Sequence, residues 1–356
     1  MTNTDTPRPA TPRPTPVWIG TYAGGGGDGF YPLHRVAKDW TLGVPYIGAP
    51  NGSFATYSAR FDLHYIVDER DDGVLGAHRF EGSEWRCLTR VSTGGAAPCH
   101  VALDRTQSCV AVANYASGSV ALFRLDHATG LPIAPPTVAT NTGSGPDTER
   151  QQSPHAHWVG FSLDNGWLYA TDLGTDEVRA FAFDAETGVL GTSTSAFVAP
   201  PGSGPRHLLI HPRHPHTAYL ACELTNRLIV LDVDGGTLRS RASLSTLPAG
   251  WEGHSIVAHI AADAAGDRLY VSNRGHDSIA VFALDGDGNP TLLQHAPSGG
   301  ASPRVVLLLE DEQRVIAVHE RDHRVTALAI LPDGRLAPTD QAITVPGAAF
   351  AFAGNR

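Results

Sequence analysis

The chain has 356 residues, a formal net charge of −10 at pH 7, 38 Gly and 26 Pro. The negative charge argues against nucleic acid or an anionic membrane as a partner, although a local cluster of Arg and His could still bind an anionic small molecule. Sustained helical periodicity is absent, and the many Gly and Pro suit a chain rich in turns.

Residues 1–16 are rich in Thr and Pro, lack an apolar run and are predicted to form a disordered tail. They show neither a signal peptide nor a transmembrane segment, so the cytoplasm is the default location. Residues 17–356 are predicted to form a single domain. The four Cys lack C-x-x-C spacing and are interpreted as reduced, partly buried side chains.

The predicted elements begin with strands at 17–22 and 29–33 and continue with a degenerate repeat at 53–77. From residue 98 onward, a clearer unit recurs about every fifty residues. Each unit has a loop with Pro, His or Arg, an apolar strand, a turn, a second apolar strand with a polar end, and a third strand. An acidic, Gly-containing turn then leads to a fourth strand. The five clear units start near residues 98, 154, 205, 258 and 303.

These units predict an all-β fold, a seven-bladed β-propeller with four-stranded antiparallel blades. The five clear units and the degenerate one account for six blades. Strands from the two termini, at 17–33 and 348–352, are expected to join in the seventh blade, which would hide the open edges of the ring.

Polar residues occupy two fixed places in the units, the start of the first strand and the end of the second. In an antiparallel blade both places lie at one mouth of the central channel, so residues distant in sequence should converge on one axial pocket. His155 and His157 are two residues apart and should face the same way in a strand. The residues at these places are His100, His155, His157, Arg206, His207, His259, Arg304, Asn114, Asp172, Glu223, Asn273, Arg274, Glu320 and Arg321.

Two interpretations of this set compete. Propellers often link neighbouring blades through buried polar groups, but a linking device would repeat one residue type, whereas here the type changes from blade to blade. A pocket for an asymmetric ligand accounts for the change. Arg binds carboxylate or phosphate through a planar fork, and His titrates near neutrality and can move a proton.

A metal site is an alternative, because the chain has 17 His. His155, His157 and Glu223 would supply two His and one carboxylate, but the positive charge of Arg206 and Arg274 nearby would disfavour a cation. We therefore predict neither a metal nor a cofactor. The sequence has no Gly-x-Ser-x-Gly elbow or P-loop, and its Gly-rich segment 24–29 links two strands.

Nearly the whole chain after the tail carries a series of motifs in a fixed order: Val17-Trp-Ile-Gly-Thr-Tyr, Pro98-Cys-His100, Ser153-Pro-His-Ala-His157, Gly204-Pro-Arg-His207, and Leu269-Tyr-Val-Ser-Asn-Arg-Gly-His-Asp-Ser-Ile-Ala-Val-Phe282. In order and spacing these motifs resemble the seven-bladed-propeller lactonase family. That family includes bacterial 6-phosphogluconolactonases and the fungal carboxy-cis,cis-muconate cyclase. By motif, the resemblance implies four catalytic residues, which are His157 (with His155 as its rival), Arg206, Glu223 and Arg274.

The expected function is hydrolysis of a sugar lactone, 6-phosphogluconolactone above all, with a small anionic lactone as the partner. Arg206 and Arg274 would hold the anionic group and stabilise the oxyanion, and His157 or Glu223 would take a proton from water. The residues expected to bind the substrate are His100, His155, His259, Arg304 and Asp172.

Two alternative functions stay open. One is a muconate cycloisomerase that forms or opens a lactone, and the other is a non-catalytic propeller that binds a ligand or a protein at its mouth. No nucleic acid or membrane is expected as a partner, and the chain is expected to be a monomer or a weak homo-oligomer.

Overall fold

A computed structural model of the protein describes residues 15–36 and 39–354. Most of the predicted tail, residues 1–14, lies outside the described residues. The last two residues of that segment are hydrogen-bonded to the domain. The Thr15 N–H donates to Glu312 Oε1 at 2.9 Å, and the Pro16 carbonyl accepts from the Gly354 N–H at 2.7 Å.

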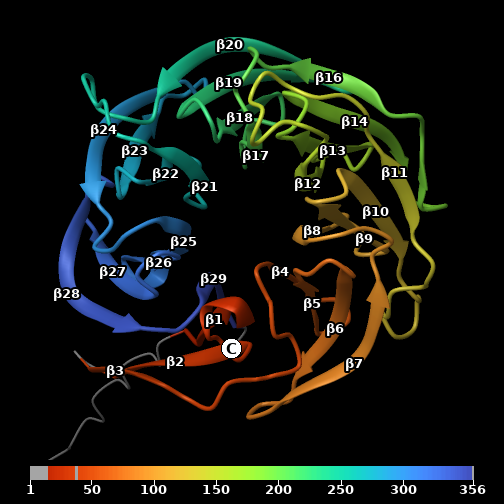
Figure 1. The fold of residues 1–356 in the computed structure, drawn as a ribbon, viewed down its shortest axis with the longest axis horizontal. Helices are drawn as coiled ribbons and strands as arrows, with labels where there is room; N and C mark the ends of the chain where they lie inside the picture. Colours follow the sequence, from red (N-terminus) through yellow and green to blue (C-terminus); the bar gives the residue numbers. More distant parts are fainter. Residues whose placement is uncertain (1–14, 37–38, 355–356) are drawn as a thin grey trace, which may run out of the picture.

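Within these residues, 29 strands form seven antiparallel sheets, which are arranged as blades around a central axis (Figure 1). This arrangement confirms the predicted seven-bladed β-propeller. Six blades have four strands, and the fourth blade adds a short outer strand, β15, that pairs with one end of β14.

The strands of each blade follow here from the innermost outward. Blade 1 contains β29 (Ala348–Ala353), β1 (Val17–Thr21), β2 (Phe30–Val36) and β3 (Asp39–Leu42). Blade 2 contains β4 (Ala55–Ser58), β5 (Leu63–Asp68), β6 (Val74–Phe80) and β7 (Trp85–Ser92). Blade 3 contains β8 (Pro98–Leu103), β9 (Cys109–Asn114), β10 (Ser119–Arg124) and β11 (Thr137–Thr140).

The remaining blades repeat this order. Blade 4 contains β12 (Ala156–Phe161), β13 (Trp167–Asp172), β14 (Glu177–Asp184), β15 (Val189–Leu190) and β16 (Thr194–Val198). Blade 5 contains β17 (Pro205–Ile210), β18 (Thr217–Cys222), β19 (Arg227–Asp234) and β20 (Thr237–Ser245). Blade 6 contains β21 (Ile256–Ala262), β22 (Arg268–Arg274), β23 (Ser278–Leu284) and β24 (Pro290–Pro297). Blade 7 contains β25 (Pro303–Leu309), β26 (Arg314–His319), β27 (Arg324–Ile330) and β28 (Leu336–Thr344).

The two ends of the chain meet in blade 1, as the sequence predicted. Strand β1 lies between β29 and β2, with Trp18 opposite Phe352 on one side and opposite Pro32 on the other. Pairing the first strand with the last closes the ring, so neither strand leaves an open inner edge.

Strands in the middle of a blade are continuous apolar runs because neighbouring blades cover both of their faces. All six residues of β9 are buried, and so are all six residues of β18. The outermost strands face solvent instead, and in β20 only Leu238 is buried.

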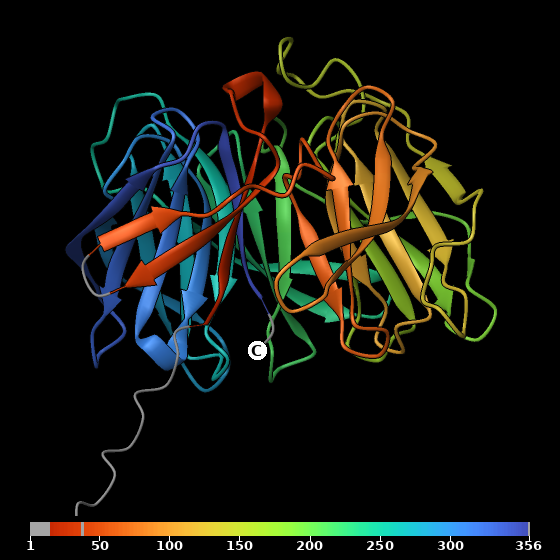
Figure 2. The same cartoon turned by 90° about the horizontal axis from the view of Figure 1, so that it is seen from below.

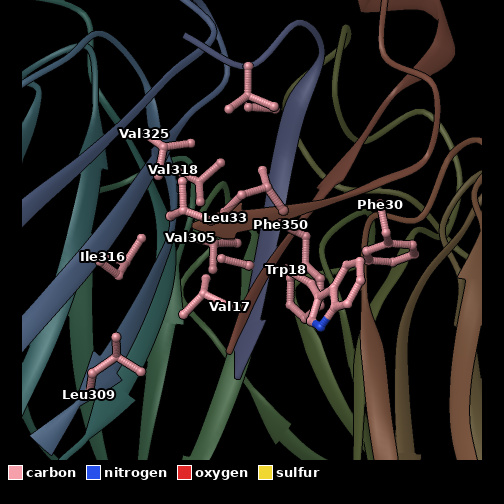
Figure 3. Packing of buried hydrophobic residues seen from close by; sticks show 14 of the residues in the cluster. Val17, Trp18, Phe30, Leu33, Val305, Leu309, Ile316, Val318, Val325 and Phe350 are labelled. Atoms are coloured by element: carbon pink, nitrogen blue, oxygen red, sulfur yellow. The ribbon is translucent and has the colours of Figure 1, made fainter. Parts of the chain in front are cut away.

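Apolar side chains hold blade 1 between its two neighbours. Phe350 of blade 1 belongs to one buried cluster with Val305 of blade 7, as Figure 3 shows. On the other side, Trp18 makes edge-to-face contacts with Phe80 and Trp85 of blade 2, with ring centroids 5.3 and 5.2 Å apart. The blade that closes the ring is therefore packed on both faces.

The helical content of the described residues is two 3₁₀ turns, η1 (Ala23–Gly25) and η2 (Glu310–Glu312). Figure 2 shows η1, in red, standing above one face of the disc. It follows β1 at the mouth where the second strands of the blades end. Across the described part of the chain, we find no helix of the length and apolar character that crossing a membrane requires.

Candidate active site

The innermost strands of blades 3 to 7 all carry a β-bulge close to their start. At each bulge the pairing with the second strand skips residues, and such a bulge re-aims the side chains around it. Consecutive residues can therefore both reach other blades: Arg206 contacts His157 of blade 4, and His207 contacts His259 of blade 6. The residues skipped by the pairing are Cys99, His157, Arg206, Ala258 with His259, and Arg304.

A buried carboxylate, Glu223, is the centre of the candidate site. It follows β18 directly and is 1% exposed. Its Oε2 is contacted by the guanidinium of Arg206 and lies 3.1 Å from Arg274 Nη2, whereas its Oε1 lies 2.7 Å from Arg150 Nη2. His157 Nε2 is 4.0 Å from Oε2. The structure thus brings together the four residues that the sequence assigned to catalysis, and it adds Arg150.

The surrounding guanidiniums keep Glu223 ionised. Burial alone raises the pKa of Glu223, but the charges of Arg206 and Arg274 outweigh it and hold that pKa well below the usual range. Burial lowers the pKa of Arg274 to about 10, so this guanidinium remains charged at neutral pH. The centre of the site is therefore a fixed carboxylate with converging positive charges.

His157 is a neutral imidazole next to these charges. Burial and the charge of Arg206 hold the pKa of His157 well below its ordinary value. Its Nε2 lies 2.6 Å from Arg206 Nη1. Because a guanidinium only donates, Nε2 accepts this bond and the ring proton is on Nδ1, which lies 3.8 Å from Cys99 Sγ.

The structure distinguishes His157 from its rival, His155. Both imidazoles contact the ring of Tyr115, His155 by stacking at 4.5 Å and His157 edge-on at 5.3 Å. His155 Nδ1 then lies 3.0 Å from the Tyr115 carbonyl, whereas His157 reaches Arg206. Strand alternation does not govern the pair, because His155 precedes β12, which begins at Ala156, and the bulge falls at His157.

Arg304 extends the same network to blades 1, 2 and 7. Its Nη2 lies 3.7 Å from Glu69 Oε2, which also accepts a hydrogen bond from the Tyr22 hydroxyl at 2.7 Å. Glu320 lies between two guanidiniums, 3.5 Å from Arg274 and 4.0 Å from Arg304. Arg304 is therefore connected to Glu223 through two intervening charged groups.

His100 and His259 form a second layer below the charged one. His207 lies between them, with ring centroids 5.5 Å from His100 and 5.4 Å from His259. Burial, together with nearby positive groups, lowers the pKa of His100 to about 3 and that of His259 to about 4. The three imidazoles line a cavity of about 310 Å³ whose other walls include Phe161 and Ile210.

The structure places Asp172, which was predicted to contact the substrate, outside the ion pairs around Glu223 and among backbone N–H groups. Asp172 pairs with Ala156 at the start of β12, and Cys222 pairs with Pro205 at the start of β17. Asp172 is thus the counterpart of Cys222, and the counterpart of Glu223 in blade 4 is the following residue, Leu173. A shift of one residue along a strand turns the side chain to the opposite face. The Asp172 carboxylate accepts hydrogen bonds from the N–H groups of His155, Gly174 and Thr175 and from Asn141 Nδ2. These four bonds match the acceptor positions of a carboxylate, which number about four.

Sequence analysis missed four residues of this network. Tyr22, Glu69 and Tyr115 each directly follow the second strand of a blade, which is the place Glu223 occupies in blade 5. That regular place could have identified them. Arg150 lies in the loop between β11 and β12, outside the repeated unit, and no sequence signal indicates where its side chain points.

The metal alternative lacks a matching arrangement of ligands. No group of three or more His, Cys, Asp or Glu side chains in the part of the chain that the structure describes is placed to hold a metal ion. Of the proposed ligands, Glu223 is surrounded by guanidiniums and His155 Nδ1 lies against a carbonyl oxygen.

Comparisons with known proteins agree with this architecture. The model of a family described as lactonase, 7-bladed beta-propeller, matches residues 16–352. The chain is 31% identical over 332 residues to the 6-phosphogluconolactonase of Bacillus subtilis, across 88% of this chain and 93% of that protein. Among solved structures, a protein from Lactobacillus plantarum has a TM-score of 0.87 at 31% identity, covering 95% of this chain and 99% of its own. The periplasmic gluconolactonase of Pseudomonas aeruginosa has a TM-score of 0.86 at 26% identity, covering 95% and 98%. The chain therefore belongs to the seven-bladed β-propeller lactonase family.

Proposed function

We propose that this protein hydrolyses sugar lactones, with a phosphorylated lactone such as 6-phosphogluconolactone as its substrate. The observation that carries the proposal is the guanidinium of Arg206, which lies between the Nε2 of neutral His157 and the carboxylate of Glu223. A positive charge beside a neutral base is what water attack on an ester carbonyl requires. The names of the Bacillus subtilis and Pseudomonas aeruginosa proteins support a lactone as the substrate class.

In the proposed reaction, a water oxygen attacks the lactone carbonyl carbon and the carbonyl electron pair moves onto its oxygen. Arg206 and Arg274 stabilise the resulting oxyanion. When Arg206 Nη1 donates to the oxyanion instead of to His157 Nε2, that nitrogen is free to accept the proton from water. The tetrahedral intermediate then collapses, the ring C–O bond breaks, and His157 returns the proton to the departing ring oxygen.

Glu223 is proposed to position the guanidiniums and not to act as the base. Its Oε2 contacts two guanidiniums and its Oε1 a third, whereas His157 Nε2 accepts from Arg206 alone, so the imidazole is the group more easily freed for a proton from water. The contacts of Glu223 with Arg206, Arg274 and Arg150 instead fix the place at which positive charge is available.

A panel of lactones tests the proposal. Acid release from 6-phosphogluconolactone and glucono-δ-lactone is followed by pH-stat, and muconolactones are followed by ultraviolet absorbance, each corrected for spontaneous ring opening. We expect acceleration of sugar lactone opening that persists in EDTA. Arg206→Lys should lower kcat by about 100-fold or more, whereas Arg86→Met, on the exposed outer strand β7, should not.

Each other outcome points to a different function. Turnover of muconolactones alone would favour the cycloisomerase alternative. No turnover of any lactone would favour a binding propeller. Activity that disappears on chelation and returns with a divalent cation would favour a metal site.

A further inference from the structure

Arg150 is presented to the channel mouth by a rigid turn in the β11–β12 loop. The Asp147 carboxylate accepts the N–H of Arg150 at 3.0 Å, and the Asp147 carbonyl accepts the N–H of Gln151 at 2.8 Å. Gln151 is fully buried and donates to the Leu173 carbonyl and to Asp176 Oδ1, both at 2.8 Å. The loop therefore holds Arg150 in one place before any ligand arrives.

Arg150 is the most accessible of the three guanidiniums that contact Glu223. Its side chain is 35% exposed, compared with 4% for Arg206 and 12% for Arg274. An anion entering from solvent meets Arg150 first. When Arg150 leaves Oε1 of Glu223, the other two guanidiniums still contact Oε2, so the carboxylate keeps its counter-charges.

Tyr115 places a second donor beside Arg150. Its hydroxyl oxygen accepts from Arg150 Nη2 at 3.3 Å, and among the contacts of the described residues the hydroxyl proton has no acceptor. The ring is held by stacking on His155, with an interplanar angle of 17°. A guanidinium fork next to a free hydroxyl donor suits the several oxygens of a phosphate group.

We propose that Arg150 and Tyr115 bind the phosphate group of the substrate and so set a preference for phosphorylated over uncharged lactones. The inference rests on the proposed function for the chemistry at the lactone ring. It assigns the accessible guanidinium to recognition and leaves the buried Arg206 and Arg274 to the carbonyl oxygen.

The test compares Arg150→Met, Arg150→Lys and Tyr115→Phe with the wild type on 6-phosphogluconolactone and on glucono-δ-lactone. Arg150→Met should lower kcat/KM for the phosphorylated lactone about 10- to 100-fold more than for the uncharged one. Arg150→Lys should recover part of the loss, and Tyr115→Phe should shift the preference in the same direction by a smaller factor. Arg86→Met removes the same charge from β7 and is the matched control, with no expected change in preference.

A binding measurement separates failure of this inference from failure of the proposed reaction. Calorimetric titration with 6-phosphogluconate and with gluconate should show that Arg150→Met weakens only the phosphorylated ligand, by about 10-fold or more. If the wild type opens no lactone, the reaction is wrong, and the titration still decides the role of Arg150. Equal losses on both lactones, or equal binding of 6-phosphogluconate by variant and wild type, would overturn the inference.

Discussion

Replacing Glu223 by Gln keeps the size of the side chain and removes its charge. The carboxylate is 1% exposed and contacts Arg206, Arg274 and Arg150, so the substitution leaves two largely buried guanidiniums without this partner. Removing one partner of a buried ion pair typically costs about 3–5 kcal/mol. Arg274 keeps Glu320 at 3.5 Å, which places the expected loss of unfolding free energy at pH 7 near the lower end, about 3 kcal/mol.

The pH dependence of stability provides an independent check on Glu223. Although burial acts in the opposite direction, the neighbouring guanidiniums lower its pKa in the folded protein. Such a carboxylate stabilises the fold above its unfolded pKa of about 4.3, and this contribution is lost as pH falls toward the folded value. The stability difference between the wild type and Glu223→Gln should therefore be largest near pH 7 and shrink below about pH 4.3.

Urea unfolding followed by circular dichroism at pH 7 and pH 4 measures both effects. The matched control is Glu84→Gln, because Glu84 is exposed and should change stability by less than about 0.5 kcal/mol. The same preparation of Glu223→Gln should lose about 100-fold or more in kcat, since the guanidiniums lose their fixed position. An unfolding free energy equal to that of the wild type at both pH values would refute the view that this carboxylate organises the site.

Three further substitutions test other parts of the argument. Arg274→Ala should lower kcat/KM about 100-fold or more for phosphorylated and uncharged sugar lactones alike, because a charge that stabilises the oxyanion is lost from a desolvated site. Steady-state kinetics would contradict this if kcat/KM stayed near the wild-type value. His157→Ala should lower kcat about 10²- to 10⁴-fold, and unchanged kcat would exclude His157 as the base. Trp18→Ala should lower the free energy of unfolding in urea by about 3–5 kcal/mol, because Trp18 is 7% exposed and packs between blades. The control Trp251→Ala, at a side chain that is 40% exposed, should lower it by about 0.5 kcal/mol. Equal losses would refute the view that Trp18 helps to close the ring.

The architecture could be predicted because every blade repeats the same pattern of buried strands and tight turns. Strands covered on both faces need apolar runs such as β9, and the turns between them need residues that tolerate tight conformations, so the unit is visible in the sequence. Closure by the two termini followed from counting the units. The convergence of Arg206, Glu223 and Arg274 followed in turn from the alternating strand directions, which place both polar positions at one mouth.

The details of the site depended on features that the sequence does not display. The bulge of β12 falls at His157, and His155 precedes that strand, which is why strand alternation did not apply to the pair. Asp172 and Glu223 both stand where a second strand ends, but Asp172 is paired at the place of Cys222, one residue before the place of Glu223. A one-residue offset is invisible in hydrophobic patterning at the end of a strand but reverses the direction of a side chain. Arg150 was missed for another reason, since its position depends on the hydrogen bonds of a loop outside the repeat.

The fold is nearly symmetric, but the charges at its mouth are not, and this asymmetry gives the site a direction. Carboxylates and guanidiniums alternate along an arc through blades 5, 6, 7 and 2, in the order Arg206, Glu223, Arg274, Glu320, Arg304 and Glu69. The arc is interrupted at blades 3 and 4, where Cys99 and Leu173 stand at the corresponding places. His157 lies in this gap, where burial and the charge of Arg206 keep it neutral although Glu223 Oε2 is 4.0 Å from its Nε2. A ligand whose reacting carbon lies over the gap would have an uncharged base on one side and fixed positive charge on the other, which is the polarity that attack on a lactone carbonyl needs.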